Sequence, residues 1–181
     1  FRSENASGLG IRALARAMEA EGLEVLGVTS YGDLTSFAQQ QSRASAFVLS
    51  IDDEEFRTPE EARAALANLR AFVEEIRFRN AEIPVFLHGE TRTSRHIPND
   101  ILRQLNGFIH MNEDTPEFVA RVILREARTY LDRAVANQRR LLGPEHPRLA
   151  MALDNLGGVT QAEGDLAAAG QRERAQRPVG I

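Results

Sequence analysis

Short apolar runs that alternate with amphipathic stretches constrain the fold of this chain more than any other feature. Residues 46–51 and 83–87 are continuous apolar runs, the kind expected when both faces of a strand are covered. Between them, apolar residues three or four positions apart predict a long helix that begins near Pro59. Residues 107–111 form another apolar run, and a closing helix is expected over residues 116–139. This alternation predicts a parallel α/β sheet with right-handed crossovers.

Several helix boundaries are marked by their own residue types. Thr58, Pro59 and Glu61 supply an N-cap, a proline in the first turn and a capping-box glutamate. Gly22 is a natural C-terminal stop for a helix over residues 8–21. Two further helices are expected to begin at prolines, namely Pro98 and Pro116. These prolines lie in a stretch whose order of loop, short helix, apolar run and second helix favours a structural module over a catalytic one.

The pattern opens on a helix, whereas a doubly wound unit normally opens on a central strand. Residues 23–29 form a short β-rich run, and a short helix is expected to end near Gln41. In the flavodoxin-like strand order 2-1-3-4-5, the absent first strand belongs between residues 23–29 and residues 46–51. The predicted fold class is therefore a flavodoxin-like parallel sheet whose first strand is missing. Because the chain begins at Phe1, we expect a fragment of a longer protein.

Composition excludes several classes of function. The net charge of -4 argues against a nucleic-acid-binding surface, and no apolar run approaches the length that crosses a membrane. Cysteine is absent, which removes disulfides and thiolate metal sites and fits a cytoplasmic protein. All 22 residues counted as lysine or arginine are arginine. The absence of lysine excludes a Schiff base, a Walker-type phosphate site and the lysine of a phosphoacceptor receiver.

Family-specific motifs occur along residues 1 to about 132. They read FRSENASGLGIRAL, GVTSYGDLTSFAQQQSRASAFVLSIDDEEF, NLRAFVEEIRFRNAEIPVFLHGETRTSRHIPNDIL and GFIHMNEDTPEFVARVILREARTYLD. These stretches resemble the N-terminal wing domain of the bacterial ornithine/lysine/arginine decarboxylases, a receiver-like domain that precedes a pyridoxal-phosphate catalytic domain. The resemblance implies a role in assembling subunits into rings, with no part in decarboxylation. It also implies an apolar strand ahead of Phe1.

The remaining residues, 133–181, depart from that pattern. Residues 142–147 read LGPEHP, residues 153–157 LDNLG, residues 164–166 GDL and residues 173–175 ERA. They resemble one tetratricopeptide repeat of the kinesin-light-chain type, in which a turn precedes GDL. A single repeat is too short to be an independent binding module, since a solenoid needs at least about three. We therefore expect either a helical hairpin of marginal stability or a fusion.

Candidate site residues cluster after the second apolar run. Arg92, Arg95 and His96 lie on a loop at the C-terminal end of a predicted strand, the usual ligand edge of an α/β sheet. We expect an anion site or a subunit contact there, with pairing to Glu90 or Asp100 as the alternative. Because some members of the resembled family bind the alarmone guanosine tetraphosphate where wing domains meet, the resemblance adds a further residue, Arg103.

Two other patterns carry weaker hypotheses. Asp52 and Asp53 end a predicted strand as a phosphoacceptor would, but the accompanying lysine and acidic pair are absent, which favours a solvated acidic loop at a helix N-terminus. The histidines lack the spacing of metal ligands, so no metal is expected. His110 is predicted to be a hydrogen-bonded core or interface residue.

The leading functional hypothesis follows from the resemblance and from the missing lysine. It is a non-catalytic oligomerisation or regulatory domain of a pyridoxal-phosphate-dependent basic amino-acid decarboxylase, present as a fragment or fusion. The expected partners are copies of itself or decarboxylase subunits, and no cofactor is expected in this chain. One alternative is a stand-alone adaptor that uses the repeat-like tail. Another, taken from the family, is the decarboxylase activity itself.

Overall fold

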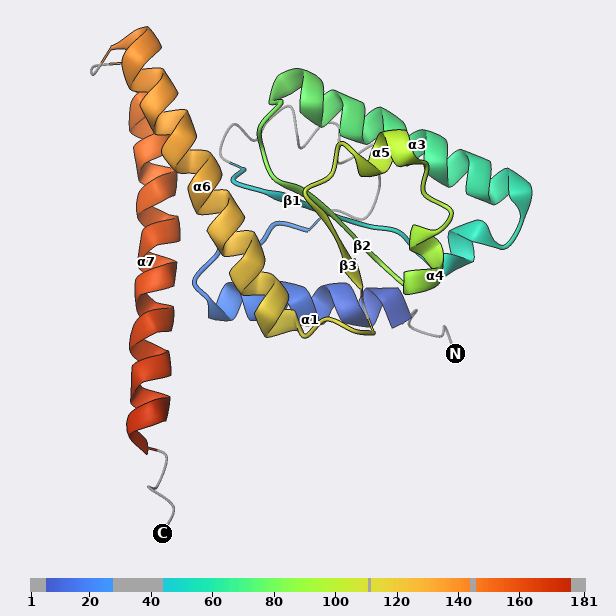
Figure 1. The fold of residues 1–181 in the computed structure, drawn as a ribbon, viewed down its shortest axis with the longest axis horizontal. Coiled ribbons are helices and arrows are strands. Elements are labelled where there is room, and N and C mark those ends of the chain that lie inside the picture. Colours follow the sequence, from blue (N-terminus) through green and yellow to red (C-terminus); the bar gives the residue numbers. More distant parts are fainter. Residues whose placement is uncertain (1–5, 28–43, 111, 144–145, 177–181) are drawn as a thin grey trace.

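The computed structural model describes residues 6–27, 44–110, 112–143 and 146–176 (Figure 1). The elements, with the labels of Figure 1, are α1 (Ala6–Ala20), β1 (Phe47–Ser50), the 3-10 helix η1 (Asp53–Phe56), α3 (Pro59–Arg79), β2 (Val85–Gly89), α4 (Thr91–Ser94), α5 (Asn99–Leu102), β3 (Gly107–His110), α6 (Pro116–Leu142) and α7 (Pro147–Gln176). None of the described helices is long and apolar enough to cross a membrane.

The strands form a parallel three-stranded sheet in the order β1-β2-β3. Val48 lies beside Phe86, and Leu87 lies beside Phe108. This confirms the parallel α/β fold predicted from the alternating pattern. On the free side of β1, where the missing strand was expected, the described residues place no strand. Residues 23–27 are not a strand either, and residues 28–29 and the helix expected to end near Gln41 lie outside the described part of the chain.

Helices cover both faces of the sheet (Figure 1). On one face, buried side chains of α1 and α6 pack against Phe86 and Ile109. On the other face, α3 and the segment around α5 pack against Leu49, Val85 and Leu87. Because successive strand residues point to opposite faces, the apolar runs supply both layers at once. A continuous apolar strand is therefore the natural middle layer of this three-layer arrangement.

Local sequence signals form the helix ends as predicted. Thr58 Oγ1 accepts a hydrogen bond from the Glu61 backbone N at 3.2 Å, and the Glu61 carboxylate accepts one from Thr58 N at 3.1 Å. This capping box satisfies donors that would otherwise be unpaired in the first turn of α3. At the end of α1, Gly22 adopts φ 80°, and the Leu23 N–H bonds to the carbonyl of Met18 at 3.0 Å. The C-terminus of α1 at Gly22 is therefore a Schellman motif.

The tail forms a helical hairpin, as expected, but its second arm differs from the predicted repeat. α6 runs without interruption through Asp132 to Leu142, Gly143 turns the chain with φ 84°, and α7 continues as one helix through Gly164. The turn expected before GDL is therefore not formed. Residues 148–176 contain no proline, and α7 packs on α6 through side chains at three- and four-residue spacing, Leu149, Ala152, Leu156 and Val159.

Candidate functional site

The segment after β2 carries three residues that were predicted to bind an anion or a neighbouring subunit from a loop, but the segment begins with the short helix α4. Arg92 of α4 has a side chain that is 82% exposed, and its Nη2 lies 3.5 Å from Glu90 Oε2. Arg95 is the exposed C-cap of α4, and the exposed His96 stacks on Phe56 with ring centroids 5.5 Å apart. The segment is thus an exposed basic surface with one intrachain ion pair to Glu90, the alternative anticipated for these residues.

Two carboxyl groups meet at this C-terminal edge of the sheet, Asp53 of η1 and Glu90 at the N-cap of α4. Hydrogen bonding to Asp53 raises the pKa of Glu90 above its ordinary 4.5, as do burial and the negative charge of Asp53, while Arg92 opposes the rise. Asp53 also accepts a hydrogen bond from the buried hydroxyl of Thr93. The carboxyl pair therefore ties α4 to η1. The neighbouring Asp52 is the N-cap of η1, as the helix N-terminus interpretation predicted.

A second polar group links α4 to the end of β3. The Thr91 hydroxyl donates to Glu113 Oε1 at 2.7 Å, and its oxygen lies 3.3 Å from Nδ1 of His110. The His110 backbone N–H donates to Asp114 Oδ2 at 2.8 Å. His110 is half-buried and hydrogen-bonded, as predicted. The short helix α4 is therefore fixed from both sides by side chains of neighbouring loops.

His88 lies inside the sheet next to this edge. Its side chain is buried, and its Nδ1 lies 3.3 Å from Ser50 Oγ on the adjacent strand. Burial lowers the pKa of His88, because a charged imidazolium loses hydration there. Within the described ranges, no group of three or more histidine or acidic residues is arranged to hold a metal ion. Burial therefore favours the neutral imidazole, and the contact with Ser50 joins β1 to β2 at this point.

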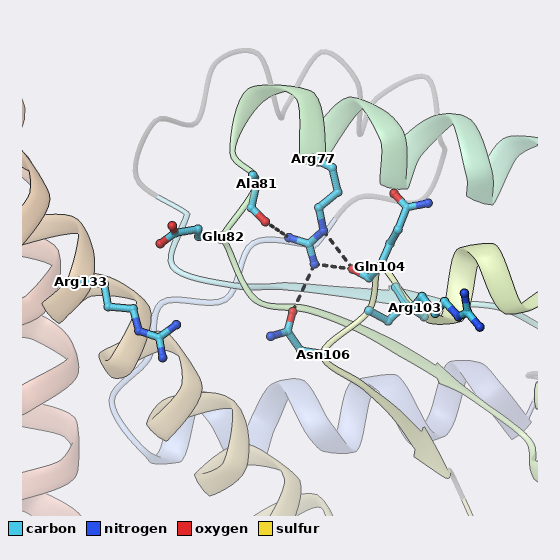
Figure 2. Close-up of a pocket in the computed structure, with 8 residues that line it drawn as sticks. Arg77, Ala81, Glu82, Arg103, Gln104, Asn106 and Arg133 are labelled. Carbon is cyan, nitrogen blue, oxygen red and sulfur yellow. Dashed lines mark hydrogen bonds between the residues drawn. The ribbon is translucent and has the colours of Figure 1, made fainter.

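A cavity of about 430 Å³ lies at the opposite, N-terminal edge of the sheet (Figure 2). It is lined by the end of α3, the segments before β2 and β3, and α6, with Arg77, Glu82, Arg103, Gln104, Asn106 and Arg133 among its residues. Arg103 and Arg133 are exposed, and Glu82 is the acidic residue of the lining. The structure therefore places Arg103 at the opposite edge of the sheet from Arg92, Arg95 and His96, the other residues of the expected anion or subunit-contact site. Asp100, on α5 before Arg103, pairs with Arg70 at 2.8 Å.

Arg77 forms the wall of this cavity and was not recognised in the sequence. Its Nε donates to the Gln104 carbonyl at 2.9 Å, and its Nη1 donates to the carbonyls of Ala81 and Ile83 at 3.1 and 2.6 Å. Its Nη2 donates to Asn106 Oδ1 at 3.2 Å (Figure 2). A guanidinium suits this position because its donors form a planar fork. The sequence signal is weak, since arginine in a last helical turn is common.

Comparisons with known proteins agree with the fold. A sequence model described as the Orn/Lys/Arg decarboxylase N-terminal domain matches residues 6–130, which is more than half of the chain. The chain belongs to this family. The part of the chain that matches the Orn/Lys/Arg decarboxylase N-terminal domain begins with α1 and ends near the middle of α6. A tetratricopeptide repeat model matches residues 124–174, so both matches include residues 124–130 of α6.

Two comparisons place this decarboxylase N-terminal domain beside a bacterial enzyme. The chain is 25% identical over 134 residues to lysine decarboxylase LdcA of Pseudomonas aeruginosa, an alignment that covers 72% of this chain and 17% of the enzyme. The solved structure of lysine decarboxylase A from Pseudomonas aeruginosa has a TM-score of 0.58 at 23% identity, covering 76% of this chain and 19% of that one. The structural likeness shows a shared fold. The chain spans less than a fifth of the length of either relative.

Proposed function

We propose that this chain is a non-catalytic assembly domain for a basic amino-acid decarboxylase. The proposal rests on the side-chain contacts at the C-terminal edge of the sheet, where α/β proteins usually bind ligands. There Thr93 bonds to Asp53, Thr91 bonds to Glu113, and Arg92 lies beside Glu90, while Arg95 and His96 are exposed. The residues present also do not fit pyridoxal phosphate, which is held as an imine by lysine, because the chain contains no lysine.

The partners in this proposal are copies of the chain or decarboxylase subunits, and the cytoplasm is the compartment in which they meet. Support comes from the family match and from the relative LdcA, named a lysine decarboxylase. Pyridoxal phosphate would belong to the partner's catalytic domain. The role of this chain would be to present surfaces that hold subunits together.

The proposal is tested by mixing the full chain with lysine decarboxylase LdcA and measuring mass by analytical ultracentrifugation. We expect self-association, co-sedimentation with the enzyme, or both. A chain that stays monomeric over the accessible concentrations and ignores the enzyme would refute the assembly role. In parallel, the chain alone with pyridoxal phosphate should release no CO₂ from lysine, arginine or ornithine. Release of CO₂ would instead favour the decarboxylase alternative.

A second proposal concerns anion binding at the cavity of Figure 2. The cavity is lined by the exposed Arg103 and Arg133, and Arg77, which lies between them in Figure 2, is already held by protein oxygens. Arginine forks suit phosphate oxygens, so the phosphates of guanosine tetraphosphate are the proposed ligand. Titration calorimetry with this nucleotide should give binding that Arg103→Ala and Arg133→Ala weaken and Arg63→Ala preserves. Equal binding by all variants would place the anion elsewhere.

The adaptor alternative rests on the helical hairpin of α6 and α7, to which the tetratricopeptide repeat model extends. A chain that ends at Leu142 separates it from the assembly role. If this shortened chain, with α1 to α6 shown to be folded by circular dichroism, still joins decarboxylase subunits, the sheet domain carries the association. If the association is lost, α7 carries it.

A further inference from the structure

Phe78 is the most exposed large apolar side chain of the described residues, with an exposed fraction of 88%. It lies in the last turn of α3, on the side opposite the buried residues Leu69, Val73 and Ile76 that pack on the sheet. α3 forms an outer layer of the molecule, across the sheet from α1 and α6 (Figure 1). An exposed aromatic side chain points to a protein contact only where the surface around it is apolar as well.

The rest of the same face is suited to receive an aromatic ring. Ala64, Ala67 and Ala71 are exposed and lie at three- and four-residue spacing that continues to Phe78 seven residues later. This is the spacing of a narrow helix–helix seam. Alanines let another helix approach closely, so the face combines a flat surface with one projecting ring.

We propose that this face of α3 pairs with the same face of a second copy of the chain, antiparallel and centred on Ala71. This rests on the assembly role proposed above and names a surface for it. An interface between identical copies must be self-complementary, since each contact occurs twice about the two-fold axis. With Ala71 on that axis, Phe78 of one copy lies level with Ala64 of the other and covers the alanines.

Charge on the two flanks of the face favours this arrangement. Arg70 and Glu74 are exposed on one flank, and antiparallel pairing brings Arg70 beside Glu74 of the second copy. On the other flank, Glu61 of the first turn comes beside Arg79 of the last turn. The present partners of these side chains are themselves accessible, as in Arg70 with the largely exposed Asp100. Opposite charges therefore meet on both sides, which selects the antiparallel orientation.

The absence of cysteine from the chain allows a direct geometric test. Two copies of Ala71→Cys meet at the axis, where the Cα separation can fall in the range of about 4.4–6.8 Å that a disulfide requires. Ala67→Cys is the matched control, because its two copies lie about 12 Å apart along the helices, at 1.5 Å per residue. In a glutathione buffer, Ala71→Cys should form a covalent dimer and Ala67→Cys should not. Equal cross-linking of the two, or none, overturns the proposal.

A mixing experiment tests the charge pairing without a covalent bond. Arg70→Glu and Glu74→Arg should each weaken self-association by about tenfold, because like charges then face each other across the axis. Mixing the two variants should restore association as a heterodimer, measured by native mass spectrometry. Restoration requires a contact between chains, because each variant carries the same charge at positions 70 and 74. Opposite charges therefore meet only when the two variants pair. Absence of restoration contradicts the pairing.

A final comparison separates failure of this surface from failure of the assembly role. Phe78→Glu should weaken self-association by about tenfold, and Phe118→Glu, at a 55% exposed phenylalanine of α6, should leave it unchanged. If the chain self-associates but Phe78→Glu has no effect, assembly stands and uses another surface. If the chain neither self-associates nor binds decarboxylase subunits, the assembly role fails together with this inference.

Discussion

At the scale of single residues, one buried polar atom is out of place in an apolar seam. Gln138 of α6 lies three residues after Val135, at the spacing of the side chains that pack on α7, and its Oε1 is buried without a hydrogen-bond partner among the described residues. An unsatisfied buried amide costs free energy. We expect Gln138→Leu to raise the unfolding free energy by about 1 kcal/mol. Thermal unfolding followed by circular dichroism measures this, and exposed Asn137→Leu, the control, should give no gain.

Glu90 provides a pH-dependent prediction at the same scale. Hydrogen bonding to Asp53, burial and negative charge raise its pKa above 4.5, so the folded protein holds this proton more tightly than the unfolded chain does. The resulting stabilisation is fully present below the ordinary glutamate pKa and is lost as the pH rises through the raised value. Glu90→Gln keeps an amide donor for Asp53 at every pH.

The melting temperature of the unchanged protein should therefore fall relative to that of Glu90→Gln as the pH rises above 4.5. Differential scanning fluorimetry with an external dye, across a pH series, measures the difference. Glu24→Gln, at an exposed loop position, should follow the unchanged protein. If the melting temperatures of Glu90→Gln and of the unchanged protein change in parallel with pH, Glu90 does not hold its proton more tightly in the folded protein.

At the scale of elements, Arg77 links the end of α3 to the segments before β2 and β3. It does so through carbonyl oxygens and Asn106, whose Oδ1 also accepts the Val85 backbone N–H at 2.9 Å. Lysine has no planar fork and cannot reach these acceptors together. Arg77→Lys should lower the unfolding free energy by about 2 kcal/mol, since several acceptors, among them the part-buried carbonyls of Gln104 and Ile83, lose their donor. Urea denaturation measures this, and a loss no greater than that of exposed Arg79→Lys would contradict the role.

The capping signals show why element boundaries were predictable. Thr58 with Glu61, and Gly22 after α1, act through backbone groups a few residues away, so their effect is set by local sequence. The partners of Arg77 lie up to 27 and 29 residues away at Gln104 and Asn106. No local pattern specifies such a contact. The wall of the cavity therefore became visible only when the chain was folded.

At the scale of the whole molecule, α6 belongs to two packing units. Val119, Ala120 and Ile123 pack in the core with α1 and the sheet, while Leu131 and Val135 pack on α7. One continuous helix therefore fixes the hairpin to the sheet domain. In Figure 1 α7 lies beside α6, away from the sheet. Because the described side chains of α7 pack mainly on α6, we expect α7 to open without unfolding the sheet.

Leu131→Ala tests this independence. This leucine of α6 is buried in a cluster with Val159 of α7, and its truncation should cost about 2–4 kcal/mol in the docking of α7. Hydrogen exchange read by mass spectrometry should then show loss of protection in α7 while β2 stays protected. Leu141→Ala, at an exposed leucine of the same helix, should change neither. Equal loss of protection in α7 and β2 would show one cooperative unit instead.

Local sequence was enough to predict β1, β2 and β3, the caps of α1 and α3, the parallel sheet and the family, but it also predicted a strand from residue 23 that residues 23–27 do not form. Those features depend on periodicity, on local hydrogen bonds and on residue types at fixed spacing, which are properties of short segments. The tertiary structure decided the rest. It separated Arg103 from Arg92 and His96, joined Asp53 to Glu90, made α7 one helix against α6, and left Phe78 in solvent. These outcomes depend on which distant surfaces meet, and packing across the sheet determines that only when the whole chain is in place.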